Sequence, residues 1–295
     1  MKFMKQLLAV AMLASAISSH AQIKLHYFGQ KPTDICSTTP YGANDKAGHY
    51  VQADDARIYY EVYGEGTPVL MLHGGMVGSA YEFGRLIDSL KVNYQVIVMT
   101  TRGHGRSEIG HKPVTYEQRA DDALAVLTAV TNEPTAVIGF SDGAYAAYKL
   151  ASMYPSHVKR LVAIGAGENL KQLRVVSPFN VEAMMKADPV FMKSQMALMP
   201  EPQRLQEYWN EMPQYYNDCM IADKKLFGSI KCPVLLMAGE RDGNAPLATV
   251  IAAYYMTPDA QLAIIAKAGH QCFVENFDAV WAGIKPFINE DSNNK

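Results

Sequence analysis

The stretch AVIGFSDG, residues 136–143, decides the fold of this 295-residue chain. Its first five residues form a short apolar run that predicts a buried strand, and a helical pattern follows at once. Between them stands Gly-x-Ser-x-Gly, with glycines at 139 and 143. A serine on such a sharp turn has a strained backbone, and side chains two positions away would collide with neighbouring backbone. The motif therefore predicts a strand-to-helix turn that exposes Ser141 beside the positive end of the helix dipole.

Outward from this turn, apolar runs of four to eight residues alternate with longer amphipathic stretches. This alternation is typical of a mostly parallel sheet flanked by helices. The expected strands are 57–63, 68–72, 95–99, 136–140, 160–164, 233–238 and 261–265. The expected helices are at about 79–90, 116–131, 142–154, 245–256 and 273–288. We therefore expect one doubly wound α/β domain.

The segment from Glu168 to about Ser229 interrupts this alternation. It contains no convincing strand, and prolines at 178, 189, 200, 202 and 213 divide it into short helical pieces. We interpret it as an inserted helical cap. Seven of the sixteen methionines lie between Met184 and Met220, together with several aromatic residues. Such side chains suit an adaptable apolar binding wall, although we expect most of them to form the small core of the cap itself.

The N-terminus has the three parts of a secretory signal peptide. Two lysines lie within the first five residues, the eleven residues 7–17 are uncharged and mostly apolar, and small residues stand at 19 and 21. We expect cleavage after Ala21 and a periplasmic or secreted product. An uncleaved anchor is the alternative, but the apolar run is short for a bilayer span. Residues 22–46 form an N-terminal leader with no assigned function, and residues 291–295 form a polar tail.

Composition places the chain among ordinary globular proteins. It is 49% hydrophobic and 19% charged, and its formal net charge is −2, which excludes intrinsic disorder and gives no sign of nucleic-acid binding. Removal of the signal would leave 25 basic and 29 acidic residues. Cysteines at 36, 219, 232 and 272 form no Cys-x-x-Cys pair, so neither a zinc site nor a redox centre is supported. We interpret them as buried small residues or at most one disulfide.

Two further residues are placed to activate the serine, because a hydroxyl becomes a good nucleophile only when a base takes its proton. Asp242 follows the expected strand 233–238, and His270 follows the expected strand 261–265. Both should emerge with Ser141 at the carboxyl edge of the sheet, where open α/β sheets bind ligands. The order Ser, Asp, His also agrees with this type of fold. We predict Ser141 as the nucleophile, His270 as the base and Asp242 as the orienting acid.

Other residues compete for these roles. Glu168 follows a strand end and is an alternative acid, whereas the side chain of Asp142 is expected to point away from the serine. The histidines at 73, 104 and 157 lie in loops or at a helix end, and we expect them to be structural or solvated.

Backbone donors for a developing oxyanion are expected in the loop His73-Gly74-Gly75-Met76, which follows a buried strand. Its glycines allow N–H groups to turn toward the reacting atoms. We predict an oxyanion hole made by the N–H groups of Gly75 and Asp142, with Met76 in place of Gly75 if the loop is shifted by one residue. A tight turn without a catalytic role is the alternative.

Together these motifs resemble the α/β-hydrolase family over roughly residues 47–290. The matching motifs are HGGM at 73–76, RGHGRS at 102–107, GFSDG at 139–143, ERD at 240–242 and AGH at 268–270. The resemblance implies an eight-stranded, mostly parallel sheet with a helical cap inserted after the sixth strand. It implies the same roles for Ser141, Asp242 and His270. Thr100 departs from the pattern, because many relatives have aspartate there, and the hydrogen bonds of that loop are left open.

The nucleophile narrows the reaction that the resemblance implies. Dehalogenases and epoxide hydrolases of the family have aspartate at this turn, so Ser141 favours esterases, lipases, lactonases, thioesterases, serine aminopeptidases and some C–C hydrolases. The GFSDG sequence is similar to that of biphenyl-hydrolase-like and lactonase-like members. We therefore expect an exported serine hydrolase that cleaves a small carboxylic ester, a lactone or a related acyl bond, without a cofactor or metal.

Two other functions stay open. A serine aminopeptidase would share the triad and would need an anion for the amino group of its substrate, which Glu168, Glu182 or Glu207 could supply. A non-catalytic binding protein of the same fold would typically have lost a member of the triad, whereas candidates for all three are present here. In each case the expected partner is a small molecule, with no nucleic acid and no stable membrane anchor.

Overall fold

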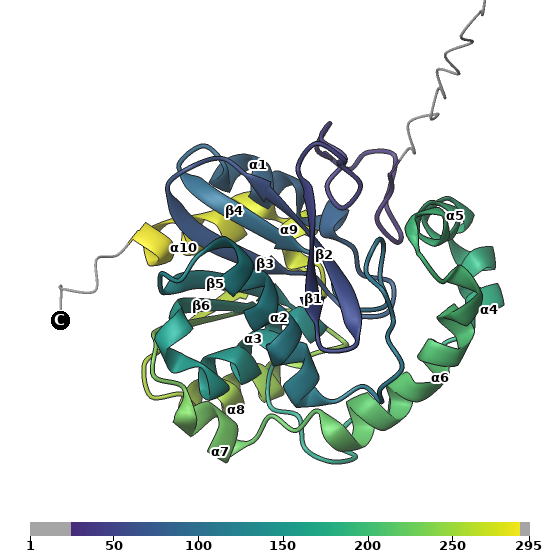
Figure 1. Cartoon of the computed structure of the whole chain (residues 1–295). Coiled ribbons are helices and arrows are strands. Elements are labelled where there is room, and N and C mark those ends of the chain that lie inside the picture. Colours follow the sequence, from purple (N-terminus) through teal and green to yellow (C-terminus); the bar gives the residue numbers. More distant parts are fainter. Residues whose placement is uncertain (1–24, 290–295) are drawn as a thin grey trace, which may run out of the picture.

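The computed structural model describes residues 25–289, so the expected signal peptide and polar tail lie outside the described residues. One sheet of eight strands runs through the described chain in the order β1-β2-β4-β3-β5-β6-β7-β8 (Figure 1). The strands are β1 Gly48–Ala53, β2 Ala56–Tyr63, β3 Thr67–Leu72, β4 Tyr94–Met99, β5 Thr135–Phe140, β6 Val158–Ile164, β7 Val234–Gly239 and β8 Ala260–Ile265.

The sheet is mostly parallel. β2 pairs antiparallel with β1 and with β4, and every other pairing is parallel. The carboxyl ends of β3 to β8 therefore share one edge, and the predicted α/β fold class is confirmed. β1 is missing from the strands that we predicted from the sequence. It is an edge strand of which only Ala53 is fully buried, so it lacks the apolar run by which the inner strands are recognised.

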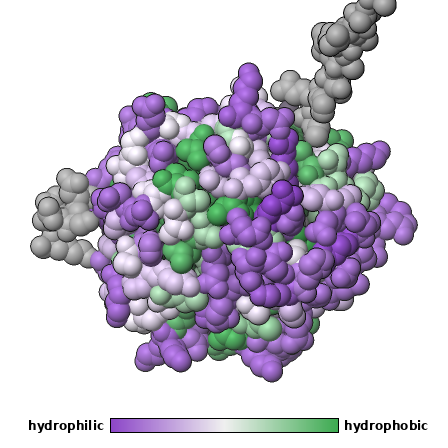
Figure 2. Space-filling model, in the orientation of Figure 1, coloured by the Kyte–Doolittle hydropathy of each residue, from purple (hydrophilic) through white to green (hydrophobic). Residues whose placement is uncertain are grey.

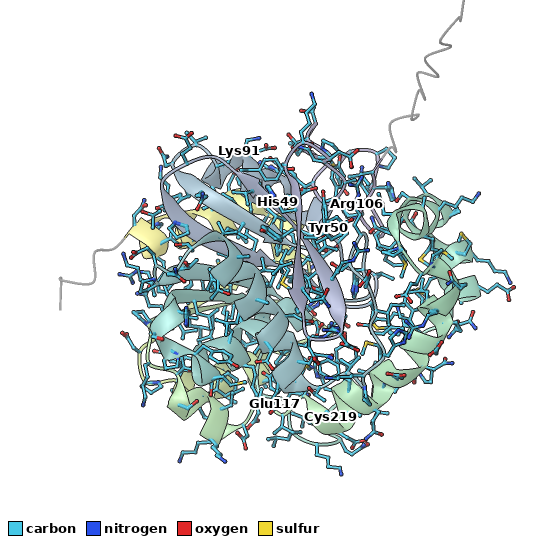
Figure 3. All side chains as sticks on the ribbon, in the orientation of Figure 1. His49, Tyr50, Lys91, Arg106, Glu117 and Cys219 are labelled. Carbon is cyan, nitrogen blue, oxygen red and sulfur yellow. The ribbon has the colours of Figure 1, made fainter. Side chains whose placement is uncertain are left out.

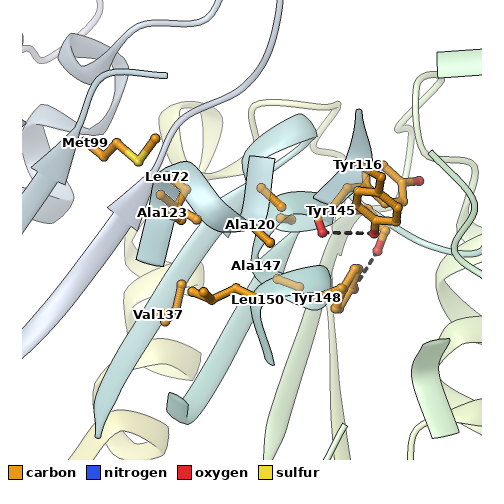
Figure 4. Packing of buried hydrophobic residues seen from close by; sticks show 14 of the residues in the cluster. Leu72, Met99, Tyr116, Ala120, Ala123, Val137, Tyr145, Ala147, Tyr148 and Leu150 are labelled. Carbon is orange, nitrogen blue, oxygen red and sulfur yellow. Dashed lines mark hydrogen bonds between the residues drawn. The ribbon is translucent and has the colours of Figure 1, made fainter. Parts of the chain in front are cut away.

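Helices cover both faces of this sheet (Figure 1). They are α1 Gly84–Leu90, α2 Tyr116–Val130, α3 Asp142–Met153, α7 Lys224–Ser229, α8 Leu247–Met256, α9 Cys272–Glu275 and α10 Phe277–Asn289. Strand side chains alternate between the two layers: Leu70 and Leu72 belong to the core beside α2 and α3, and Val69 and Met71 to the core beside α1 and α10. Figure 4 shows the first core, which includes Leu150 of α3.

A helical insertion follows β6, as predicted. It contains α4 Val181–Ala187, α5 Pro189–Leu198, α6 Leu205–Gln214 and a π-helical turn, Tyr215–Cys219, and α4 to α6 form an arc beside the sheet (Figure 1). Pro213 does not divide helical pieces, contrary to our expectation. It lies inside α6, and the wider π-helical turn follows directly.

The last helix that we assigned to the insertion belongs to the main domain by its contacts. α7 packs against α3 and α8 on one face of the sheet. The separate helical layer therefore ends before residue 224, and not near residue 229, the limit that we took from the absence of a strand.

The surface seen in Figure 2 is mostly hydrophilic, with small and scattered hydrophobic areas. Within residues 25–289, no helix is both long enough and apolar enough to cross a membrane. All four cysteines are free thiols. Cys232 and Cys272 are buried, as expected of small apolar residues, whereas Cys219 is exposed at the end of the π-helical turn (Figure 3).

Candidate active site

Ser141 occupies the turn between β5 and α3. Its backbone has φ 52° and ψ −120°, a conformation that residues with a side chain rarely adopt. The Ser141 N–H donates to the carbonyl oxygen of Ile164 at 2.8 Å, which holds the turn against β6. A Cβ at Gly139 would lie 2.5 Å from the carbonyl oxygen of Gly143, and a Cβ at Gly143 would lie 2.1 Å from that of Leu72. Both glycines are therefore required by the close approach of backbone.

Three side chains from three strand ends form one hydrogen-bonded chain. His270 Nε2 lies 3.0 Å from Ser141 Oγ, and His270 Nδ1 lies 2.8 Å from Asp242 Oδ2. The other carboxylate oxygen of Asp242 accepts the N–H groups of Asn244 and Ala245, each at 2.8 Å, which fixes its orientation. In such a chain the imidazole can take the serine proton while the carboxylate orients it. The structure thus brings together the three residues that the sequence singled out.

The imidazole of His270 lies in a close-fitting site. Its ring centroid is 4.7 Å from that of Phe140, the residue before the serine. Gly165 has φ 64°, and a Cβ there would lie only 3.0 Å from His270 Cε1 and 3.3 Å from Phe140 Cε2. A larger residue at 165 would therefore push against the imidazole and lengthen its bond to Ser141.

The loop after β3 lies against the Ser141 turn. A Cβ on Gly75 would lie 2.9 Å from Asp142 Cβ, so the two predicted oxyanion donors are neighbours. The Gly75 carbonyl oxygen accepts the Gly78 N–H at 2.9 Å, and Met76 takes φ 56°, which closes a tight turn. Within the described chain, the N–H groups of Gly75 and Asp142 have no acceptor. Their role in an oxyanion hole stays a prediction that this geometry permits.

Comparison with known proteins agrees with this arrangement. The profile of the alpha/beta hydrolase fold matches residues 67–197, which contain the glycine loop, the serine turn and part of the insertion. The chain has the α/β-hydrolase fold. RutD of Azorhizobium caulinodans, named as a carbamate hydrolase, is 28% identical to this hydrolase over 245 residues, which cover 75% of this chain and 91% of RutD.

Two further relatives of this hydrolase cover most of its length. The serine hydrolase BPHL of Mus musculus is 25% identical over 211 residues, which cover 66% of this chain and 70% of BPHL. The solved structure of Est816, described as an N-acyl homoserine lactone degrading enzyme, has a TM-score of 0.61 at 25% identity and covers 81% of this chain and all of that one. The chain is thus similar to hydrolases along most of the described domain.

Two other histidines of the hydrolase are buried near the site. Burial disfavours the charged imidazole and lowers the pKa of His73 to about 4 and that of His104 to about 3. His73 Nε2 accepts the N–H of Thr101 at 2.9 Å, and the two imidazole rings pack 5.1 Å apart. Both histidines therefore join the loops after β3 and β4 as neutral structural groups, which agrees with the expectation from the sequence.

Thr100 departs from the family pattern, and hydrogen bonds nevertheless hold the loop that contains it in place. Its N–H donates to the Tyr59 carbonyl oxygen at 2.9 Å, and its own carbonyl oxygen accepts the Ser107 hydroxyl at 2.6 Å. Arg102 is fully buried in this loop and pairs with Asp122 at 2.8 Å. The RGHGRS segment is therefore held to β2 and α2, and none of these contacts involves a residue of the triad.

A buried carboxyl group, Glu82, was not found from the sequence. It accepts the Gly74 N–H and the side-chain amide of Gln271, each at 3.1 Å, and thereby joins the loops that carry Gly75 and His270. Burial raises the pKa of Glu82 to about 7. No motif marks this residue, because it lies in a 3₁₀ turn before α1 and away from every strand end.

The serine of the hydrolase opens into a cleft of about 940 Å³. Only Met184 and Met220 of the seven methionines in the insertion line it, together with Phe179. The other five pack into the hydrophobic cluster that the insertion shares with the main domain, and not into a core of the insertion alone as we expected. The insertion nevertheless supplies an apolar wall opposite the sheet edge.

The N-terminal leader supplies part of the same wall. Phe28 lines the cleft and packs edge-on against Phe191 of α5, with ring centroids 5.6 Å apart. Asp188 accepts the Gly29 N–H at 2.8 Å and contacts His26 Nε2 at 3.0 Å, and it also caps α5 through the Phe191 N–H. We assigned no function to the leader from the sequence, because a single aromatic residue outside the region of resemblance carries no signal.

The carboxylates expected for an aminopeptidase do not reach the cleft. Glu182 pairs with Lys186 on the exposed side of α4, and Glu207 lies near Arg204 on α6. Neither these nor Glu168 is among the described residues that line the cleft. Glu168 is also not the acid beside the histidine of the hydrolase, since Asp242 occupies that position.

Proposed function

We propose that this hydrolase is an exported enzyme that cleaves small carboxylic esters, lactones or related acyl bonds through an acyl-enzyme. The observation that carries the proposal is the hydrogen-bonded chain Ser141–His270–Asp242 at the opening of the cleft. A serine hydroxyl, a histidine and an orienting carboxylate in this geometry are the groups that acyl transfer requires.

The mechanism follows from the positions of these groups. Ser141 Oγ attacks the acyl carbonyl carbon while His270 Nε2 takes the hydroxyl proton, and the N–H groups of Gly75 and Asp142 stabilise the oxyanion. When the tetrahedral intermediate collapses, the leaving alkoxide takes the proton from His270 and departs as an alcohol. Water then loses a proton to His270 and attacks the acyl-enzyme, and Ser141 regains its proton as the acid leaves. Asp242 keeps the imidazole oriented and stabilises its charged form.

Two observations support small acyl substrates. The cleft has the size and the apolar and aromatic lining typical of small-molecule sites. RutD is named for carbamates and Est816 is described by its action on N-acyl homoserine lactones, so both of these relatives are associated with carbonyl compounds of modest size.

The test is the replacement of the nucleophile. Ser141→Ala should abolish hydrolysis of p-nitrophenyl acetate and labelling by a fluorophosphonate probe, while the circular dichroism spectrum and melting temperature stay close to wild type. A folded wild-type protein that is neither labelled nor active would contradict the proposal and favour a binding protein. Faster turnover of amino-acid anilides than of esters would instead favour an aminopeptidase.

Export is a separate part of the proposal and rests on the N-terminal sequence pattern. Mass spectrometry of the protein from a fractionated bacterial host should find a mature chain that begins at Gln22 in the periplasm or medium. A chain that keeps its first 21 residues and stays with the cytoplasm would contradict this part and leave the catalytic part untouched.

A further inference from the structure

One cation in the wall of the cleft has no ionic partner in the described chain. Among the described residues that line the cleft, Arg174 is the only lysine or arginine. It lies in the segment that leads from the sheet into α4, and its side chain is half-buried. The aminopeptidase hypothesis requires an anion near the serine, and a cation at this position would oppose the ammonium group of such a substrate.

Uncharged groups hold the guanidinium of Arg174. Its Nη1 donates to the Asn244 carbonyl oxygen, its Nε donates to Asn169 Oδ1 at 3.4 Å, and its Nη2 donates to the Tyr145 hydroxyl at 3.1 Å. The guanidinium carbon also lies 5.7 Å from the centroid of the Tyr145 ring. Each terminal nitrogen carries a second N–H that these contacts leave unused. The group is therefore oriented, while its charge is not neutralised by a neighbour.

The groups that hold Arg174 belong to the same elements as the triad. The Tyr145 N–H donates to the Ser141 carbonyl oxygen at 3.1 Å in the first turn of α3. The Asn244 N–H donates to Asp242 Oδ1 at 2.8 Å. The guanidinium therefore lies near the reacting end of the cleft, and a substrate group bound to it would be near the serine.

None of the three carboxyl groups that line the cleft pairs with Arg174. Asp142 points away from the serine, as expected, with Oδ2 at 3.8 Å from Arg119 Nε. Glu82 is buried and accepts two N–H groups from the neighbouring loops. Glu275 is exposed and accepts the Gly269 N–H at 3.0 Å. An anion that enters the cleft thus meets one positive charge that no described carboxylate neutralises.

We propose that Arg174 binds a carboxylate of the substrate, so that the preferred substrates are acyl compounds that carry a second, anionic carboxyl group. The planar guanidinium matches a carboxylate and forms charge-assisted hydrogen bonds with it. The same charge repels the ammonium group of an amino-acid substrate. This inference rests on the proposed hydrolase function and specifies its substrate class.

The experiment compares two esters of equal length, mono-p-nitrophenyl glutarate and p-nitrophenyl pentanoate, which differ by a carboxylate in place of a methyl group. The readout is the ratio of kcat/KM for the anionic ester to that for the neutral ester. Arg174→Met should lower this ratio at least about tenfold, mainly through KM of the glutarate ester, because it removes charge-assisted hydrogen bonds. Arg174→Lys should give an intermediate ratio, since lysine keeps the charge but not the planar fork.

The matched control is Lys171→Met, which removes a cation from the same segment. Lys171 is 72% exposed and lies 3.8 Å from Asp218, outside the cleft lining, so its loss should leave the ratio as in wild type. A ratio for Arg174→Met within twofold of wild type would overturn the inference. If wild type hydrolysed the neutral ester and its ratio were insensitive to Arg174, only this inference would fail. Hydrolysis of neither ester would overturn the proposed function with it.

A measurement on the unmodified enzyme covers the case in which Arg174→Met does not fold. Glutaric acid monoamide, which has one carboxylate, and the uncharged pentanamide are compared as competitive inhibitors of pentanoate-ester hydrolysis by the wild-type protein. The monoamide should bind at least about tenfold more tightly, and added salt should reduce this difference because it screens the ion pair. Equal inhibition by the two compounds at low salt would overturn the inference.

Discussion

The sheet edge and the wall of the cleft hold their functional side chains in different ways. At the sheet edge, β5 is buried along its whole length, and the glycines of the Ser141 turn lie so close to other backbone that an added Cβ would come within 2.5 Å of it. In the wall, α4 has no fully buried residue, and Phe28 reaches the cleft from a leader outside the sheet. Backbone packing therefore fixes the positions of the catalytic side chains, whereas side chains on the insertion and leader determine the shape of the cleft.

This difference indicates which parts of the molecule tolerate substitution. A substitution at the sheet edge meets backbone atoms that cannot move without disturbing several strands. A substitution in the wall meets side chains that can repack at lower cost. We therefore expect large losses of rate from changes at the edge, and changes of preference between substrates from changes in the wall.

The largest effect is expected at Asp242, the triad acid at the sheet edge. Asp242→Asn should lower kcat for a p-nitrophenyl ester about 10⁴-fold, as in other triads, because the amide no longer favours the imidazole tautomer that accepts the serine proton. The volume of the side chain is unchanged, and the N–H groups of Asn244 and Ala245 keep an oxygen acceptor. Stopped-flow or steady-state kinetics together with a urea denaturation curve would check both parts. A loss of less than tenfold would mean that another acid orients His270.

A smaller effect is expected at Glu82, which joins two loops of the sheet edge. Its pKa rises from 4.5 to about 7 on folding, so the folded state binds the proton more tightly. Stability from this group is therefore fully present below about pH 4.5 and decreases as the pH rises to about 7. Over that interval the wild type should lose on the order of 3 kcal/mol more of its free energy of unfolding than Glu82→Gln does.

Urea denaturation of both proteins at pH 5 and pH 8 measures this difference. The comparison with Glu82→Gln removes the opposite contribution of His73 and His104, whose lowered pKa values make stability decrease on acidification in both proteins. Parallel pH profiles for the two proteins would show that Glu82 titrates normally and does not couple the loops through its protonation.

The smallest effect is expected in the wall, at Phe28. Phe28→Ala should change the ratio of kcat/KM for p-nitrophenyl octanoate to that for p-nitrophenyl acetate by roughly three- to tenfold in favour of the longer chain, because it opens apolar space in the cleft. The matched control is Ile35→Ala in the same leader, where the side chain is 71% exposed and outside the cleft. A loss of activity toward both esters alike would contradict a role in chain-length preference.

Much of the sheet edge was predictable because its residues carry strong local signals. Each inner strand is a short apolar run, and each predicted triad residue directly follows such a run, so topology alone brings them to one edge. The glycines at 139 and 143 are also a local signal, because the close approach of other backbone leaves no room for a Cβ there. The edge strand β1 was missed because its exposed residues give no apolar run.

The wall was less predictable because its contacts join segments far apart in the chain. Phe28 meets Phe191 across the leader and the insertion, and Glu82 meets Gln271 across most of the domain. No periodicity or motif links such pairs. The absence of a strand gave the insertion its approximate limits, but the packing of α7 on α3 and the π-helical turn after Pro213 are seen only in the structure.

The α/β class, the serine turn and the three triad residues could be predicted from the sequence, because strand pattern and backbone sterics act locally. The tertiary structure alone decided which side chains line the cleft, that Arg174 stands there without a carboxylate partner in the described chain, and that Glu82 is buried between two loops. Burial and charge pairing depend on what lies across the fold. Local sequence therefore determines the chemistry, and packing between distant segments determines the environment in which it acts.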